Sequence, residues 1–172
     1  MDIQVVTGYR YLWGFIGDRE EEERLMSEKI TGWAESVETL ARVSHKQPQY
    51  SYAGLQKSLQ KEWAFVQRVT PGIGDAFGPA EKALQENFMP ALFEGLRERA
   101  SERGVTHLPV KQAGLDIPDP TQTAPEKWIA SCVNTGHLVA ALRGQVELHT
   151  VEQSTCLREG QTAVRQRRQW RA

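Results

Sequence analysis

Apolar residues recur every three or four positions over much of this chain, a spacing that places them on one face of an α-helix. The clearest run follows Asp18 and Glu21, which resemble a capping box, and it is closed by Pro48. A second run predicts a helix from about Tyr50 to Val69, broken by the turn at 71–74. The two apolar faces consist of Met26, Ile30, Trp33, Val37 and Leu40, and of Tyr52, Leu55, Leu59, Trp63 and Val66.

Weaker patterns predict the later helices. A third helix starts at Pro79, buries Ala80, Leu84 and Phe88, is kinked or split by Pro90, and ends at Gly104. A fourth follows a capping box formed by Thr123 and Glu126, and the segment 151–172 is weakly amphipathic with a basic end. The predicted stripe of the fourth helix is Trp128, Cys132, Thr135, Val139, Leu142 and Val146.

Two stretches lack the helical spacing. Residues 3–17 are rich in β-branched and aromatic residues and in glycine, which predicts two short strands in a hairpin turning near Thr7-Gly8. Residues 105–123 contain three prolines and read as an irregular linker. The sequence therefore predicts a mainly α fold, with a short N-terminal β-hairpin followed by about five helices, divided into 1–104, the linker 105–123, and 124–172. The predicted core is Trp33, Leu40, Leu59, Trp63, Leu84 and Phe88.

Composition excludes several classes of protein. The 172 residues are 40% hydrophobic and 25% charged, which is typical of a globular domain. Two cysteines form no disulfide framework, and we find neither a signal peptide nor an apolar run of roughly 20 residues, so we expect an intracellular protein without a membrane partner. Cytoplasm and nucleus both stay open. The net charge of −1 gives no overall attraction to nucleic acid, which would have to bind local patches.

Two such basic patches are present. Lys57, Lys61 and Arg68 share one face of the second helix, opposite its apolar face, and such a face can lie along a phosphate backbone. The chain end carries arginines around Trp170, a combination suited to phosphate contact and base stacking. These arginines are Arg165, Arg167, Arg168 and Arg171. The alternatives are a solvated helix face and a basic terminus that keeps the chain soluble.

Two motifs resemble the reverse transcriptases of non-LTR retrotransposons. Residues 11–17 read YLWGFIG and resemble the strand that leads from the palm into the thumb, with Trp13 where the family usually has glycine. Residues 108–117 read LPVKQAGLDI and resemble a "GGLG" stretch downstream of the thumb, with Ala113 and Asp116 replacing its first and last glycines. The second motif continues through Asp119-Pro120, Ala124 and Ala130-Ser131. The resemblance implies a thumb-like helical bundle between the motifs.

Polymerase chemistry is not expected. The resembled enzymes hold two metal ions with an aspartate pair in the palm and a further acid, whereas this chain has no Asp-Asp pair, and its nearest aspartates, Asp116 and Asp119, read as turn residues. Zinc is not expected either, because the spacings of four candidate ligands do not match a structural site, and one of them, Cys132, is predicted to pack as a buried thiol. The four are Cys132, His137, His149 and Cys156. We predict no catalytic residue, metal or cofactor, and identify no small-molecule substrate.

Two functions follow from these observations. The first is a non-catalytic reverse-transcriptase fragment that binds RNA or DNA weakly at most, through its basic patches. The alternative is a helical protein–protein interaction module in which apolar faces drive formation of a homo-oligomer. An enzyme of another type would need residues that the sequence does not offer.

Overall fold

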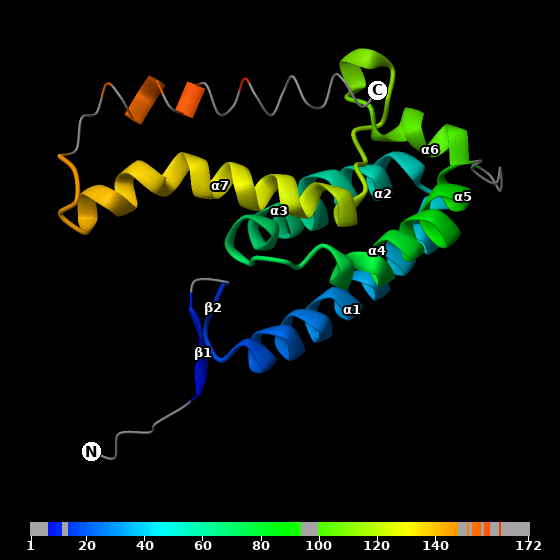
Figure 1. The fold of residues 1–172 in the computed structure, drawn as a ribbon. Helices are drawn as coiled ribbons and strands as arrows, with labels where there is room; N and C mark the ends of the chain where they lie inside the picture. Colours follow the sequence, from blue (N-terminus) through cyan, green and yellow to red (C-terminus); the bar gives the residue numbers. More distant parts are fainter. Residues whose placement is uncertain are drawn as a thin grey trace.

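The computed structural model describes residues 7–11, 14–93 and 100–147 and, near the C-terminus, residues 151, 153–155, 157, 158 and 162. Within these residues the chain is mainly helical, with a two-stranded antiparallel sheet near the N-terminus (Figure 1). The predicted fold class is therefore confirmed.

The hairpin pairs β1 (Gly8–Tyr11) with β2 (Gly14–Gly17). Tyr11 pairs with Gly14, so the hairpin does not turn near Thr7-Gly8 and that prediction is wrong. Gly8 instead faces Gly17 across the base of the hairpin, where a Cβ on Gly17 would lie 2.2 Å from the Cα of Gly8. Glycine is needed there because the two backbones approach closely. The sequence prediction had interpreted Gly8 as a turn residue instead.

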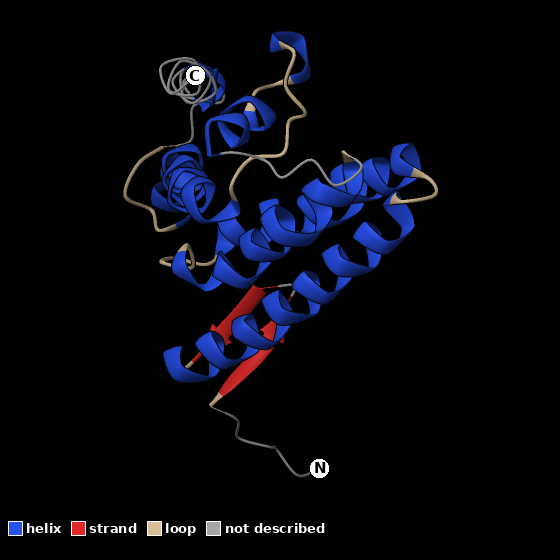
Figure 2. Ribbon diagram, turned by 90° about the vertical axis from the view of Figure 1, so that its right-hand side faces the viewer, coloured by secondary structure: helices blue, strands red, loops and turns tan. Residues whose placement is uncertain are grey.

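The long helix α1 (Arg19–Ser44) follows the sheet, which lies beside its N-terminal half (Figure 2). Asp18 is its N-cap, as predicted, but the carboxylate accepts no capping hydrogen bond. The predicted face is buried except for Leu40, which is half-buried against the core. The helical segments that follow α1, up to residue 92, therefore pack on one continuous apolar stripe.

Two further helical rods pack on α1. The first consists of α2 (Pro48–Gly54), the π-helical turn η1 (Leu55–Leu59) and α3 (Gln60–Val69). The second consists of the 3₁₀ turn η2 (Asp75–Phe77), α4 (Gly78–Ala83), the π-helical turn η3 (Leu84–Phe88) and α5 (Met89–Leu92). The second rod continues past Pro90, directly after the wider turn η3, the kind of local change that accommodates a proline inside a helix.

An aromatic cluster forms the centre of the bundle. Trp33 stacks on Phe77 with ring centroids 5.9 Å apart, and Trp63 lies 6.3 Å from Trp33. All three rings are buried, as are Leu59, Leu84 and Phe88 from the predicted core. The predicted core is thus confirmed, with Leu40 at its margin.

The last described helices depart most from the predictions. Helix α6 (Ala100–His107) runs through Gly104, where we predicted a helix end, and the 3₁₀ turn η4 (Val110–Gln112) follows. Helix α7 (Pro120–Leu142) begins one turn before the predicted capping box, because Asp119 caps it by accepting a 2.7 Å hydrogen bond from the Thr121 amide. Within the predicted linker, Ile117 is fully buried in the core.

The predicted apolar stripe of α7 is not a buried face. The helix lies along α3 (Figure 1), and its two buried residues, Pro120 and Ala124, belong to its first turns. Cys132 is exposed, so its predicted role as a packed thiol is wrong. The other exposed members of the stripe are Thr135, Val139, Leu142 and Val146.

Candidate nucleic-acid interface

The predicted basic face is formed by Lys57 in η1 and by Lys61 and Arg68 in α3, and all three side chains are exposed. We call these three residues the basic stripe. The buried face of the same rod includes Leu59, Trp63 and Val66. At 3.6 residues per turn, the three positions of the basic stripe fall on the other side of the helix. The stripe therefore presents its charges to solvent.

None of the three cations forms an ion pair with a carboxylate of the described residues. Arg68 uses its Nε to donate a 2.8 Å hydrogen bond to the carbonyl of Ala64 in its own helix. Glu62 is the acidic residue of α3, and its Oε2 accepts a 3.0 Å hydrogen bond from the Trp33 indole, on the side that faces α1. The Glu62 carboxylate is thus engaged towards α1 and not in an ion pair with the stripe.

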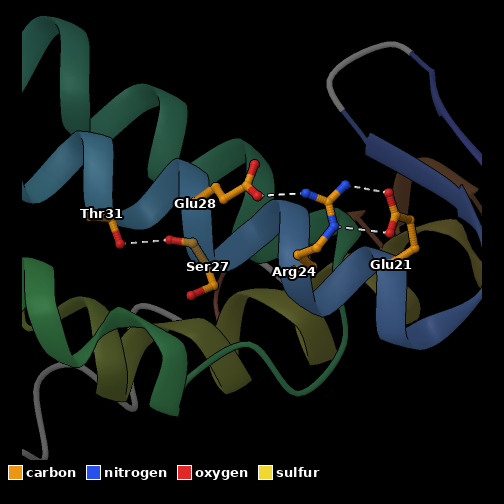
Figure 3. Close-up of polar contacts among 5 residues, drawn as sticks. All are labelled: Glu21, Arg24, Ser27, Glu28 and Thr31. Carbon is orange, nitrogen blue, oxygen red and sulfur yellow. Dashed lines mark hydrogen bonds and ion pairs between the residues drawn. The ribbon is translucent and has the colours of Figure 1, made fainter.

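The exposed face of α1 shows the opposite arrangement (Figure 3). Arg24 bridges two acids of its own helix, with Nη1 2.6 Å from Glu28 Oε1 and Nε 3.0 Å from Glu21 Oε2. The hydrogen bonds from Arg24 lower the pKa of Glu21, and Glu21 together with Glu28 raises the pKa of Arg24. The one cation of this group is thus held in ion pairs with acids of its own helix, unlike the cations of the basic stripe.

Phe65 lies on the exposed side of α3, four residues after Lys61 and three before Arg68. Its side chain keeps 38% of its surface exposed. The sequence analysis missed this residue because it does not belong to the apolar stripe of the helix. Its position outside that stripe was the available signal, because it indicates an exposed aromatic ring. An aromatic ring thus lies within the basic stripe.

A polar groove of about 170 Å³ borders the stripe between α3 and the start of α7. Lys61 and Lys127 both line this groove. Lys127 donates a 2.7 Å hydrogen bond from Nζ to Oε1 of Gln67, a fully buried amide whose Nε2 donates to the carbonyl of Pro120, also at 2.7 Å. The buried amide fixes the position of a second lysine beside the stripe, which spacing alone did not reveal.

Side chains of the α2–α3 rod also donate hydrogen bonds to backbone carbonyls of the segment that precedes α7. The Tyr52 hydroxyl donates to the carbonyl of Leu115 at 2.6 Å, and Gln56 donates to the same oxygen at 2.8 Å. Gln60 donates to the carbonyl of Asp116 at 3.2 Å. Burial, together with the nearby negative charge of Asp116, raises the pKa of Tyr52. These contacts keep the 115–120 segment against the rod and so shape one wall of the groove.

The predicted arginines of the C-terminal patch, Arg165, Arg167, Arg168 and Arg171, lie outside the described residues. In the part of the chain that the structure describes, no group of three histidine, cysteine or acidic side chains could hold a metal ion. Nor does any described helix combine the length and apolarity needed to cross a bilayer.

Comparison with known proteins adds no relative: no protein-family model, curated protein or solved structure matches the chain. Function must therefore be argued from the residues themselves.

Proposed function

We propose that the chain is a non-catalytic thumb-and-connection segment of the kind found in non-LTR reverse transcriptases, and that it binds nucleic acid through the basic stripe. The observation that carries this proposal is the set of three exposed cations without a carboxylate partner, Lys57, Lys61 and Arg68. Phosphate contacts of this type position a backbone without reading its sequence. The expected affinity is low, because three contacts release few counterions.

The backbone of the second motif supports the resemblance. Ala113 and Asp116 occupy the two positions at which the resembled family has glycine, and they adopt φ values of 64° and 51°. Glycine reaches this left-handed region without the steric cost that other residues incur. Gly114, which keeps the family residue, leaves no room for a side chain, because a Cβ there would lie 2.1 Å from the carbonyl oxygen of Leu108. The chain path therefore suits the glycine pattern of the motif.

A salt titration tests the proposal. Binding of a fluorescent duplex should weaken with salt, with a log–log slope of about −2.7 for three phosphate contacts at about −0.9 each. Replacing Lys57, Lys61 and Arg68 together with glutamine should remove most of this slope and leave the helical circular dichroism unchanged. The matched control replaces Arg42, Lys46 and Lys82, three exposed cations elsewhere on the bundle, and should keep the wild-type slope. A wild-type protein that binds no nucleic acid at low salt would refute the proposal.

A second candidate function, self-association, is favoured by a different observation on α7. Ile129, Cys132, Gly136 and Val139 are exposed at spacings of three, four and three, the repeat of a coiled-coil seam. We call these residues the α7 seam. Ile129 keeps 51% of its surface exposed, and the helix carries two charged residues, Glu126 and Lys127, in its 23 positions. An exposed apolar stripe on so weakly charged a helix is typical of an interface.

Sedimentation distinguishes this candidate from nucleic-acid binding. Self-association through the α7 seam should depend on protein concentration and hardly on salt, because apolar contacts are not screened. Val139→Glu should shift the protein to the monomer. Val110→Glu, at an exposed apolar position of η4, should leave the association unchanged. A wild-type protein that sediments as a monomer at every concentration would exclude this function.

A further inference from the structure

We infer that the basic stripe binds single-stranded nucleic acid, with the ring of Phe65 stacking on a base between the phosphates held by Lys61 and Arg68. This inference rests on the proposed function and names its ligand. It depends on the position of one aromatic ring among three unpaired cations, all on one exposed face of the α2–α3 rod.

The spacing of the stripe suits a strand that runs along the helix. Residues three or four apart are neighbours on a helix surface, with Cβ atoms roughly 5–6 Å apart, so Phe65 adjoins both Lys61 and Arg68. Lys57 and Arg68 are eleven positions apart, which corresponds to roughly 16 Å at about 1.5 Å per residue. That length covers several nucleotides of one strand. Cations therefore lie on both sides of the ring along the path of the backbone.

The burial of Phe65 differs from that of its aromatic neighbour. Trp63, two positions earlier, is buried in the core against Trp33 and Phe77. Phe65 leaves 38% of its surface in water, which is unfavourable for a large apolar ring. Base stacking on the exposed part would remove that surface from water, and every base has a face that can stack.

A duplex cannot use the ring in this way. Its bases stack on one another, so a helix on the outside reaches phosphates but no base face. In a single strand the bases can turn towards an aromatic side chain while the phosphates contact the flanking lysine and arginine. The combination of cations and an exposed ring thus favours the single strand, whereas a stripe of cations alone would not discriminate.

The test compares anisotropy titrations of a labelled oligo(dT) of about 16 nucleotides, the matching oligo(U), and a duplex of equal length. Phe65→Leu keeps an apolar side chain but removes the ring, and Phe65→Tyr keeps the ring. Phe93→Leu is the control, since Phe93 is 37% exposed and lies at the end of α5, outside the stripe. Thermal unfolding of each variant confirms that the bundle is intact.

We expect Phe65→Leu to weaken single-strand binding by about 5- to 150-fold, the range that corresponds to loss of one base stack. The slope with salt should not change, because the ring carries no charge. Duplex binding should be unaffected, and Phe65→Tyr should bind single strands like the wild type. In addition, the indole fluorescence of Phe65→Trp should be quenched by oligo(dT) and not by the duplex.

Two results would overturn the inference while leaving the proposed function intact. One is wild-type affinity of Phe65→Leu for the single strands; the other is an equal loss on single strand and duplex, which would assign the ring a structural role. Failure of the wild type to bind any of the three probes at low salt would instead refute the proposed function itself.

Discussion

Replacement of Trp33 by alanine is the most direct test of the bundle that carries the candidate interface. The Trp33 ring is buried between the stacked ring of Phe77, at 5.9 Å, and that of Trp63, at 6.3 Å. Its indole N–H donates to Glu62 at 3.0 Å, and the ammonium of Lys29 lies 5.2 Å from the ring centroid. The side chain thus joins α1 to both other rods of the bundle.

The expected cost follows from this environment. Truncating a buried tryptophan to alanine costs about 3–5 kcal/mol, because apolar contacts are lost and a cavity remains. This cost is a large part of the total stability of such a domain, about 5–15 kcal/mol. At about 2–4 °C per kcal/mol, Trp33→Ala should lower the melting temperature by roughly 6–20 °C. Trp33→Phe keeps most of the stacking and loses the bond to Glu62, so its cost should be about 1–2 kcal/mol.

Urea unfolding followed by circular dichroism measures these differences. The control is Tyr50→Ala, since Tyr50 is 74% exposed at the start of α2 and its removal should change the free energy of unfolding by less than about 0.5 kcal/mol. Equal losses at Trp33 and Tyr50 would mean that α1 does not bury the face described here. The assignment of the core would then be wrong, and with it the assignment of the basic stripe to the opposite, exposed side of the α2–α3 rod.

Three further predictions concern the segment before α7 and the chemistry. Tyr52→Phe removes the hydrogen bond to Leu115 and should cost about 1 kcal/mol. Because the pKa of Tyr52 is raised in the folded protein, the stabilisation linked to its protonated hydroxyl is fully present below the unfolded pKa of about 10 and is lost as pH rises from there through the folded pKa. Above about pH 10 the wild type should therefore lose more unfolding free energy than the variant. Ala113→Gly should raise the unfolding free energy by about 1 kcal/mol in urea titrations, because φ is 64° there, and an unchanged or lower value would contradict the strain. The purified chain should incorporate no nucleotide on any template–primer with magnesium or manganese, and incorporation that is abolished by substitutions within the chain would overturn the non-catalytic proposal.

The helices of the bundle could be predicted because their burial follows from local periodicity. Ile30, Trp33 and Val37 lie on one face of α1 whatever the other helices do, and a face so apolar has to be covered. The same reasoning located Leu84 and Phe88. Spacing within one helix was sufficient in each of these places.

Predictions failed where the structure depends on a competition or on a partner distant in sequence. Asp119 and Thr123 are both residue types that cap helices well. Helix α7 begins after Asp119, whose carboxylate also accepts a 2.6 Å hydrogen bond from the Thr121 hydroxyl. The stripe of α7 has helical spacing, yet α3 covers only its first turns. Periodicity identifies an apolar face but does not say whether another element of the chain reaches it.

The candidate interface was predictable to the same extent. The exposure of Lys57, Lys61 and Arg68 followed from their spacing against the apolar face. Their lack of acidic partners did not, because it depends on where Glu62 points in three dimensions. The position of Lys127 beside the stripe was equally out of reach, since it requires the buried amide of Gln67 to meet a helix 60 residues later.

The basic stripe and the α7 seam belong to different helices, and this separation makes the two candidate functions independently testable. The polar groove beside the stripe is lined by Lys61 of α3 and Lys127 of α7, and no residue of the α7 seam lines it. A variant of the stripe should therefore change the response to salt without changing the response to protein concentration, and a variant of the seam should do the reverse. If both responses were lost together in either variant, stripe and seam would be parts of one surface, and nucleic-acid binding would require the assembled oligomer.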